Sequence, residues 1–466
     1  MISSPVCPAH AALEVNLDLV RKYNVAGPRY TSYPPATHFT EAVDAGQVLE
    51  CVRASNESAR DFSLYFHLPF CYSLCWFCGC TTVITGNQDA SRVYVEQLDR
   101  EIGLLHPLLN PRRRVTQLHF GGGSPTFLHP DHMRQLGEVI HRRFTLADDV
   151  EAGVEIDPRR LVRDHLVALR EIGFNRASLG VQDHNPVVQK AVHRIQPFDQ
   201  TKQAVDWVRE TGFRSVNIDL IYGLPHQTPD SFERTLEEVL TLAPDRFAVF
   251  NYAYVPWMKP AQKIIKEEVM PTAETKFQLL KLTIEKLSAE GYVYIGMDHF
   301  ARADDELALA QRRKTLQRNF QGYSTRGGAD IYAFGMSSIS QTDALYWQNR
   351  KELPAYYEAL RADQLPVARG YRLTEDDRRR REIIMRLMCD LSLDYAAMSG
   401  RLGLDFSAAF AAELEALSEL EDDGLIRRSA DGLEVTPLGR LFIRNIAMRF
   451  DAHLAKDAVR RYSRTV

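Results

Sequence analysis

The feature that most constrains the fold is a regular alternation of short apolar runs and amphipathic helical runs between residue 62 and about residue 300. Six runs rich in β-branched and aromatic residues are predicted to be strands: SLYFHL at 63, TQLHF at 116, AGVEI at 152, RASLGV at 176, SVNIDLIY at 215 and FAVFNYAY at 247. Repeated strand and helix units of this length join parallel strands through right-handed crossovers. The sequence therefore predicts an α/β fold with a partial (βα)6 barrel of the TIM type.

The two flanks of this alternation have different patterns, and a chain of 466 residues is too long for one ordinary core. Residues 1–45 include KYNVAGPRYTSYPPATHF, a Pro- and Tyr-rich stretch that predicts an extended N-terminal arm laid over the rest. After about residue 370, helical runs and a hairpin turning at Asp431-Gly432 resemble a winged helix. We therefore expect an arm at 1–45, a barrel domain at 46–369 and a mostly helical C-terminal domain at 370–466.

Charge and hydropathy argue against two classes of partner. A net charge of −4 and a pI near 6.4 favour neither nucleic acid nor an anionic membrane. The run RRRR at 378–381 lies between Glu375, Asp376, Asp377 and Glu382, so ion pairs four residues apart on an exposed helix explain it. No apolar run reaches the roughly 18 residues of a membrane span, and the first residues lack a secretory pattern. We expect a cytoplasmic monomer.

Polar residues and glycines cluster where the predicted strands end. In chain order they are His67, the stretch GGGSP at 121–125, Glu155 with Asp157, Gln182 with Asp183, Asp219 and Ala253. Each alone could be a helix cap or a turn residue. Because the carboxyl ends of parallel strands meet at one rim, we expect all of them to surround one shared site. The glycine triplet lacks the spacing of nucleotide-binding loops, and its missing side chains would let a ligand lie against the backbone.

The ten residues CYSLCWFCGC at 71–80 hold four of the seven cysteines of the chain. Such a cluster in a cytoplasmic protein indicates metal or redox chemistry, and its spacing, C-x3-C-x2-C with Cys80 two residues later, suits a [4Fe-4S] cluster better than zinc. Three ligands would leave one iron open, whereas four would make a closed electron carrier. If the chain at 78–80 is extended, Cys80 points away from Cys78, which favours the open cluster.

These motifs resemble a known family. A C-x3-C-x2-C loop after the first strand of a partial barrel, with a glycine-rich loop after the second, resembles the radical S-adenosylmethionine (SAM) superfamily. Further stretches follow one another as in oxygen-independent coproporphyrinogen III oxidases: GPRYTSYP, FHLPFCYSLCWFCGC, LHFGGGSPTFL, EIDPR, LGVQDHN, HRIQP, NIDLIYGLP, GMDHFA and NFQGY. The resemblance covers nearly the whole chain. It implies a radical SAM oxidoreductase that converts two propionates of coproporphyrinogen III to vinyl groups, giving protoporphyrinogen IX in haem biosynthesis.

The resemblance also implies the site residues. Cys71, Cys75 and Cys78 would bind the cluster, and Cys80 would not, so that SAM docks on the open iron. No side chain would act as the catalytic group, because the radical comes from the cofactor. The residues that would bind two SAM molecules are Tyr65, Phe77, Gly122, Gly123, Ser124, Glu155, Gln182, Arg194, Asp219, Ala253 and Ile339, the last two contacting the second molecule. An electron donor and an acceptor are required, and the sequence identifies neither.

Two further hypotheses concern the substrate and a rival function. Arg29 in the arm is the candidate for binding a propionate of coproporphyrinogen III, with an ordinary surface arginine as the alternative. The rival is a haem-binding chaperone on the same scaffold. Those relatives typically lack the PRYTSYP arm and have an aromatic residue where Cys80 stands, so both features favour the oxidase.

Overall fold

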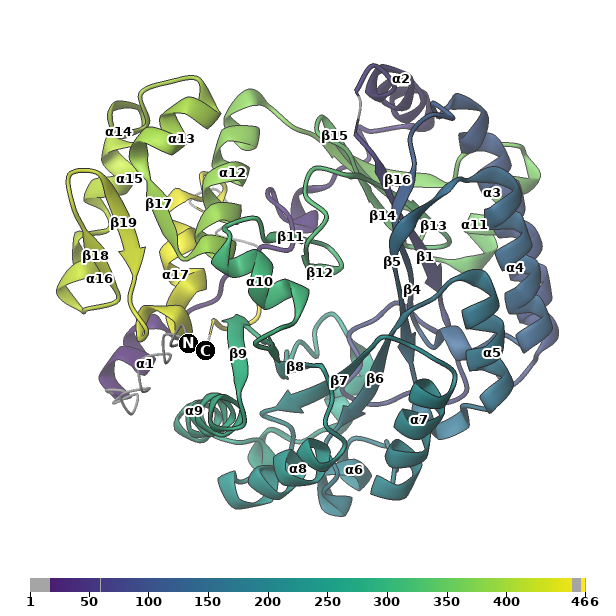
Figure 1. Cartoon of the computed structure of the whole chain (residues 1–466), viewed down its shortest axis with the longest axis horizontal. Coiled ribbons are helices and arrows are strands. Elements are labelled where there is room, and N and C mark those ends of the chain that lie inside the picture. Colours follow the sequence, from purple (N-terminus) through teal and green to yellow (C-terminus); the bar gives the residue numbers. More distant parts are fainter. Residues whose placement is uncertain (1–16, 59, 455–461, 466) are drawn as a thin grey trace, which may run out of the picture.

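The computed structural model describes residues 17–58, 60–454 and 462–465, so the part of the arm before residue 17 lies outside the described residues. All six predicted strands are present and pair in parallel around one curved sheet (Figure 1). They are β1 (Phe62–Leu68), β4 (Val115–Gly122), β5 (Leu146–Ile156), β6 (Arg176–Gln182), β7 (Ser215–Tyr222) and β8 (Arg246–Asn251). The predicted α/β fold with a partial parallel barrel is therefore confirmed.

Helices that follow these strands in sequence cover the outer face of the sheet (Figure 1). They include α3 (Asp89–Leu105), α4 (Pro130–Arg143), α5 (Arg163–Ile172), α7 (Phe198–Glu210), α8 (Pro229–Thr241) and α9 (Ala273–Ala289). Helices α4 and α5 approach closely because Gly137 has no side chain, and a Cβ there would lie 2.5 Å from Ile172. No described helix is both long enough and apolar enough to span a membrane.

The sheet extends beyond the predicted strands at both edges. Strand β13 (Asp330–Phe334) pairs in parallel with the free side of β1, and β14 (Ile339–Gln341), β15 (Leu345–Asn349) and β16 (Val367–Arg372) continue from it in antiparallel pairs. At the opposite edge, β10 (His299–Arg302) and β9 (Tyr292–Gly296) follow β8. Most of these additional strands are joined without a helix, so the alternation of strands and helices does not reveal them.

A second hydrophobic core joins the arm to the C-terminal region. Val20, Tyr23, Tyr30 and Tyr33 of the arm pack among buried residues that lie mostly between 383 and 450. The elements there include α1 (Leu17–Tyr23), α12 (Glu375–Asp390), β17 (Ser392–Asp394), α13 (Tyr395–Leu402), β18 (Ile426–Arg428), β19 (Gly432–Val435) and α17 (Ile443–Ala447). Strands β18 and β19 pair antiparallel, as the predicted hairpin requires. We call this the second core.

The arginine run at 378–381 lies on α12, and its ion pairs agree with the prediction from sequence. Arg379 pairs with Glu375, and Arg380 lies 2.8 Å from Asp376, each four residues apart. Arg381 reaches Asp343 at 2.5 Å. Ion pairs four residues apart, as predicted, therefore account for two of the four arginines, and a third pairs outside the helix.

Candidate active site

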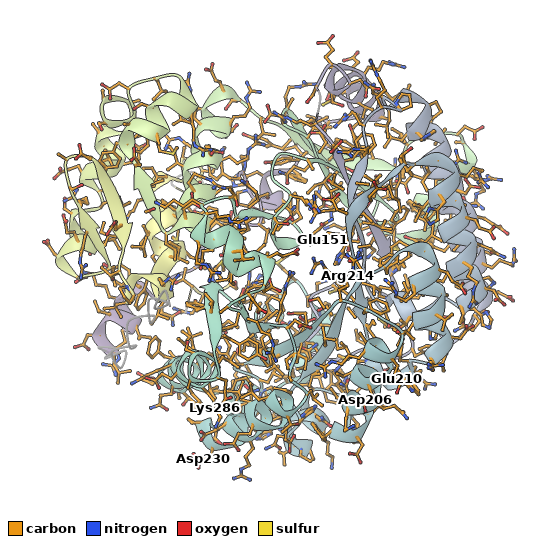
Figure 2. The ribbon with its side chains drawn as sticks, viewed as in Figure 1. Glu151, Asp206, Glu210, Arg214, Asp230 and Lys286 are labelled. Atoms are coloured by element: carbon orange, nitrogen blue, oxygen red, sulfur yellow. The ribbon has the colours of Figure 1, made fainter. Side chains whose placement is uncertain are left out.

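A cavity of about 390 Å³ lies inside the barrel at the cysteine loop. Ten of the residues implicated from sequence line it: Cys71, Cys75, Phe77, Cys78, Gly122, Gly123, Glu155, Gln182, Arg194 and Asp219. Glu151 of β5, deeper in the same cavity, lies at the centre of the ring of strands (Figure 2). The structure thus brings strand-end residues of β4, β5, β6 and β7 to one cavity, whereas His67, Asp183 and Ala253 do not line it, and the role of each residue stays a prediction.

The cysteine loop is held at several points. It begins at β2 (Phe70–Cys71), which pairs with β3 (Val83–Ile84). Within the loop the Cys78 N–H donates to the Cys75 carbonyl oxygen at 3.0 Å. The Trp76 ring stacks on His193, and Nδ1 of His193 lies 2.9 Å from the Leu74 carbonyl oxygen. These contacts fix the loop over the cavity.

Cys80 does not point away from Cys78. Its backbone N–H lies 3.4 Å from the Cys78 sulfur, and its thiol also bonds to that sulfur, which lowers the pKa of Cys78 to about 6. Both side chains line the cavity, because the chain bends at Cys80. The argument from an extended chain was therefore wrong, although the choice of three iron ligands rests separately on the family resemblance.

The thiols suit an iron-sulfur cluster better than a single metal ion. Within the described ranges, no three His, Cys, Asp or Glu side chains gather around one ion position. Each thiolate of a [4Fe-4S] cube binds a different iron, so such convergence is not required. Nη2 of Arg159 lies 3.4 Å and Nη1 of Arg194 3.6 Å from the Cys75 sulfur. Two guanidinium groups there would offset thiolate charge, so the residues present fit the cluster.

The glycine triplet is required by neighbouring protein atoms. A Cβ on Gly122, whose φ is +116°, would lie 2.5 Å from Nδ1 of His67, and one on Gly123 would lie 2.5 Å from the backbone of Pro69. Backbone bonds also tie the triplet to the start of the cysteine loop, with Gly123 N–H donating to the Leu68 oxygen at 2.8 Å. Gly122 and Gly123 face the cavity as well, whereas the adjoining Ser124 is buried beside it.

Two carboxylates face the cavity with opposite pKa shifts. Burial alone would raise the pKa of Glu155, but hydrogen bonds from His119 and from the Gly122 N–H hold it below its usual value. Burial raises the pKa of Asp219 to about 7, despite donation from Ser178 Oγ at 2.8 Å and Asn217 Nδ2 at 2.7 Å. At neutral pH Glu155 is therefore ionised and Asp219 is near the midpoint of its titration.

Arg194 pairs with Asp157 at 3.2 Å and donates to the Gly180 oxygen at 2.5 Å. Among the described residues, no ion pair joins Arg194 to Asp183, the aspartate that follows β6. Asp157 also binds Arg159 at 2.6 Å, and although burial opposes ionisation, the two arginines lower the pKa of Asp157 to about 2. Sequence reasoning missed Arg159, although it lies in EIDPR, two residues after a strand-end carboxylate.

Tyr65 and Ala253 lie close to the cavity residues but do not line the cavity. The Tyr65 ring stacks on His119 at 5.8 Å, and its hydroxyl lies 3.3 Å from Nδ1 of His67. The Ala253 oxygen accepts from Nε2 of the buried Gln262, which also donates to the Phe77 oxygen at 2.9 Å. Gln262 thus links the segment after β8 to the cysteine loop.

Ile339 and Arg29 lie further out. Ile339 is the first residue of β14 and is opposite Gln348 of β15. Arg29 forms an ion pair with Asp298, and its guanidinium lies 5.9 Å from the ring of Phe250, which lines the cavity. Arg29 is therefore paired rather than an ordinary surface arginine, and its substrate role stays a prediction.

Sequence reasoning also missed the charged inner wall of the cavity. Arg176 is the first residue of β6, and Arg246 is the first residue of β8. Both pair with Glu306, and the distance from Arg246 to Glu306 is 2.8 Å. Arg246 also lies 2.8 Å from Asp305, and Arg176 lies 4.0 Å from Glu151. The signal in the sequence that could have indicated this wall is an arginine at the first position of each of two otherwise apolar strands.

Comparison with known proteins agrees with this geometry. Residues 65–239 match the model of the radical SAM superfamily, and residues 373–442 match that of the HemN C-terminal domain. An oxygen-independent coproporphyrinogen III oxidase of Synechocystis sp. is 46% identical over 97% of this chain and 98% of that protein, and one of Pseudomonas aeruginosa is 45% identical over 96% and 98%.

The solved structure of coproporphyrinogen III oxidase (HemN) from Escherichia coli, described as a radical SAM enzyme, is also similar. It has a TM-score of 0.90 and 43% identity, covering 95% of this chain and 100% of that chain. Radical SAM membership implies a [4Fe-4S] cluster and SAM, which suits the cysteine loop and its cavity. The chain therefore belongs to the oxygen-independent coproporphyrinogen III oxidases of the radical SAM superfamily.

Proposed function

We propose that this chain carries out the oxygen-independent oxidative decarboxylation of two propionate side chains of coproporphyrinogen III, giving the vinyl groups of protoporphyrinogen IX in haem biosynthesis. The observation that carries the proposal is the single cavity that gathers Cys71, Cys75 and Cys78 with Glu155, Arg194 and Asp219. Relatives between 41% and 46% identical over nearly their whole length are named for this activity.

When bound, the [4Fe-4S] cluster and SAM supply an electron and a 5'-deoxyadenosyl radical, which is chemistry that no side chain can provide. Each propionate loses a hydrogen atom from its β-carbon, then CO2 and one electron. Cys71, Cys75 and Cys78 would hold the cluster, with one iron left open for SAM. Arg194 and Arg159, fixed by Asp157, would place positive charge beside the cluster at the Cys75 sulfur.

The remaining cavity residues orient the cofactor. Glu155, ionised at neutral pH, suits an ammonium group or a hydroxyl, and Asp219 suits a ribose hydroxyl or the sulfonium. A cation beside Asp219 would favour its charged form. Ala253 and Ile339 are assigned to a second SAM molecule, on the cysteine-loop side and the β14 side respectively.

The arm at 1–45, the radical SAM domain at 46–369 and the C-terminal domain at 370–466 act together in this proposal. The arm packs in the second core, and its Arg29 reaches Asp298 beside the cavity residue Phe250. A cover of this kind would exclude water and oxygen from a radical. We further propose a cytoplasmic monomer that needs a one-electron donor and an acceptor and binds neither nucleic acid nor membrane.

Anaerobic incubation of the reconstituted chain with reductant, SAM and coproporphyrinogen III tests the proposal. We expect 5'-deoxyadenosine, CO2 and a divinyl product. Cleavage of SAM without loss of CO2 would keep the radical chemistry and remove the substrate assignment. A haem titration of the apoprotein addresses the chaperone alternative, which no observation here favours, and we expect no tight binding.

A further inference from the structure

A row of side chains crosses the antiparallel extension of the sheet. Ile339 of β14 is opposite Gln348 of β15, which is opposite Arg369 of β16. Cross-strand partners place their side chains on the same face of a sheet. Arg369 therefore lies two strands beyond Ile339 on one face, and its Nε donates to Oε1 of Gln348 at 2.8 Å.

The arm holds this guanidinium in place. The ring of Phe39 lies 5.8 Å from the Arg369 guanidinium carbon. The neighbouring Thr40 exchanges two backbone hydrogen bonds with Gly370, at 2.9 and 2.8 Å, so the arm pairs with β16 beside Arg369. Among the described residues, none accepts a hydrogen bond from the two terminal nitrogens of Arg369. Gln348 and Phe39 thus orient the Arg369 side chain, and its two terminal nitrogens remain available to bind an anion.

Two lysines lie near this arginine. Lys351 follows the end of β15, and Nζ of Lys259 donates to the Cys80 oxygen at 2.9 Å, which places Lys259 at the cysteine loop. Burial, then the charges of Arg369 and Lys259, lower the pKa of Lys351, so both cations lie close enough for their charges to act on Lys351. In the part of the chain that the structure describes, no carboxylate lies within ion-pair distance of any of them, and Glu352, next in sequence, offsets Lys351 least.

We infer that Lys259, Lys351 and Arg369, the rim cations, form a carboxylate-binding subsite whose occupant is a propionate of the tetrapyrrole substrate. This inference rests on the proposed function. Cations gathered without a counter-ion repel one another, and a bound carboxylate relieves that repulsion. The planar fork of Arg369 suits a carboxylate, and the lysines add point charges.

The position of the rim cations suits a propionate of the substrate that is not reacting. Lys259 contacts the cysteine loop at Cys80, and Arg369 ends the strand row that starts at Ile339. The substrate has four propionates, of which two react, so unreacted carboxylates are present at every step. A carboxylate held at the rim keeps the macrocycle in place while another propionate enters the cavity.

Fluorescence titration with coproporphyrin III, the stable oxidised form of the substrate, tests the inference on the anaerobically reconstituted protein. We expect Arg369→Gln to weaken binding roughly tenfold or more and Lys351→Gln to weaken it less. Lys263→Gln is the matched control, because Lys263 is an exposed lysine on the same segment as Lys259 and is outside the subsite. Its affinity should equal that of the unmodified chain. Lys259 is left intact, since its loss would also disturb the cysteine loop.

A second arm identifies the source of the carboxylate, because SAM also carries one. Equilibrium dialysis should show unchanged SAM affinity and stoichiometry in Arg369→Gln, with unchanged iron content. Weakened SAM binding with normal porphyrin binding would overturn the propionate assignment. Unchanged binding of both ligands would overturn the subsite. Either result leaves the proposed function standing if the unmodified chain still forms the divinyl product.

Discussion

The two hydrophobic cores of the molecule are assembled in opposite ways. The barrel core is built mainly from consecutive strand and helix units, so most neighbours in space are near neighbours in sequence. The second core joins Val20, Tyr23, Tyr30 and Tyr33 to residues that lie mostly between 383 and 450, from opposite ends of the chain. The barrel carries the cofactor residues, whereas the second core fixes the arm that reaches the cavity. Cofactor chemistry and arm docking should therefore respond to different substitutions.

The largest effect is expected on the barrel side. Cys75→Ser should remove a cluster ligand, so iron and sulfide content should fall and SAM cleavage should be undetectable. Cys80→Ser is the matched control, and it should retain the absorption spectrum of a [4Fe-4S] cluster. Equal loss of the cluster in both variants would contradict the three-ligand assignment and favour a closed cluster. Stability of the second core should be unchanged in either variant.

For the second core, the variant with the largest expected effect on arm docking is Arg444→Met in α17. The Arg444 guanidinium is buried and donates to the oxygens of Gly27, Pro28 and Arg464, the latter two at 3.0 Å. Removing it leaves three backbone acceptors without that partner, and we expect a loss of about 4 kcal/mol in unfolding free energy. Iron content after reconstitution should stay normal. Unfolding by denaturant, followed by circular dichroism, measures the change.

Arg449→Met is the control for that experiment. Arg449 pairs with Glu419 at 2.9 Å, but both side chains are substantially exposed, so its loss should cost less than about 1 kcal/mol. If the Arg444 and Arg449 variants lose equal stability, the buried guanidinium does not organise the arm.

The second core contains the buried cation Arg444, whereas the barrel core contains a buried acidic group. Glu101 of α3 accepts hydrogen bonds from Gly335 N–H at 2.8 Å, Asn349 Nδ2 at 2.6 Å and the Tyr356 hydroxyl at 2.6 Å. Burial nevertheless raises the pKa of Glu101 from 4.5 to about 7. The folded state therefore retains a proton that the unfolded chain releases between these values. The contribution of Glu101 to stability is present below pH 4.5 and falls by about 3 kcal/mol as pH rises through 7.

Glu101→Gln separates this contribution from other titrations. Thermal unfolding between pH 5 and 7.5 should show a shallower loss of stability in the variant than in the unmodified chain. Parallel pH profiles for the two proteins would mean that Glu101 is ionised in the fold. The sheet extension at Gly335 would then be held by a charged carboxylate.

The contrast between the cores also explains what could be predicted from sequence. The six parallel strands and the residues at their ends followed from local patterns, because each strand pairs with the next one along the chain. Strand β13 was not predicted, since its partner β1 lies far away in sequence and no helix separates it from β14. The docking of Tyr30 and Tyr33 in the second core depends on residues more than 400 positions away, such as Asp451 and Ala452.

Within the site, residue types were predicted better than orientations. The cavity brings Glu155 and Asp219 together, as strand ends in a parallel barrel must. The direction of Cys80 depended on a bend that its sequence neighbours do not specify. Sequence alone does not choose a partner for Arg194, because Asp157 and Asp183 each follow a strand, and only the fold places Asp157 at 3.2 Å from it.

The smallest expected effect is a pH dependence inside the cavity. Asp219 has a pKa of about 7 without a bound cation, so it is mostly protonated at pH 6 and mostly ionised at pH 8. A positively charged ligand prefers the ionised form, and the affinity for SAM should therefore rise over this range, by up to about tenfold. Asp219→Asn should bind weakly and with little pH dependence, whereas Arg449→Met should follow the unmodified chain. Equilibrium dialysis at pH 6, 7 and 8 measures this affinity, and a flat profile in the unmodified chain would place the sulfonium away from Asp219.

The same pH profile tests whether the two cores act independently. Because Asp219 lies in the barrel, the pH dependence of SAM affinity should persist in Arg444→Met under conditions in which that variant is folded. Loss of the pH dependence in the folded variant would mean that the second core influences the cavity.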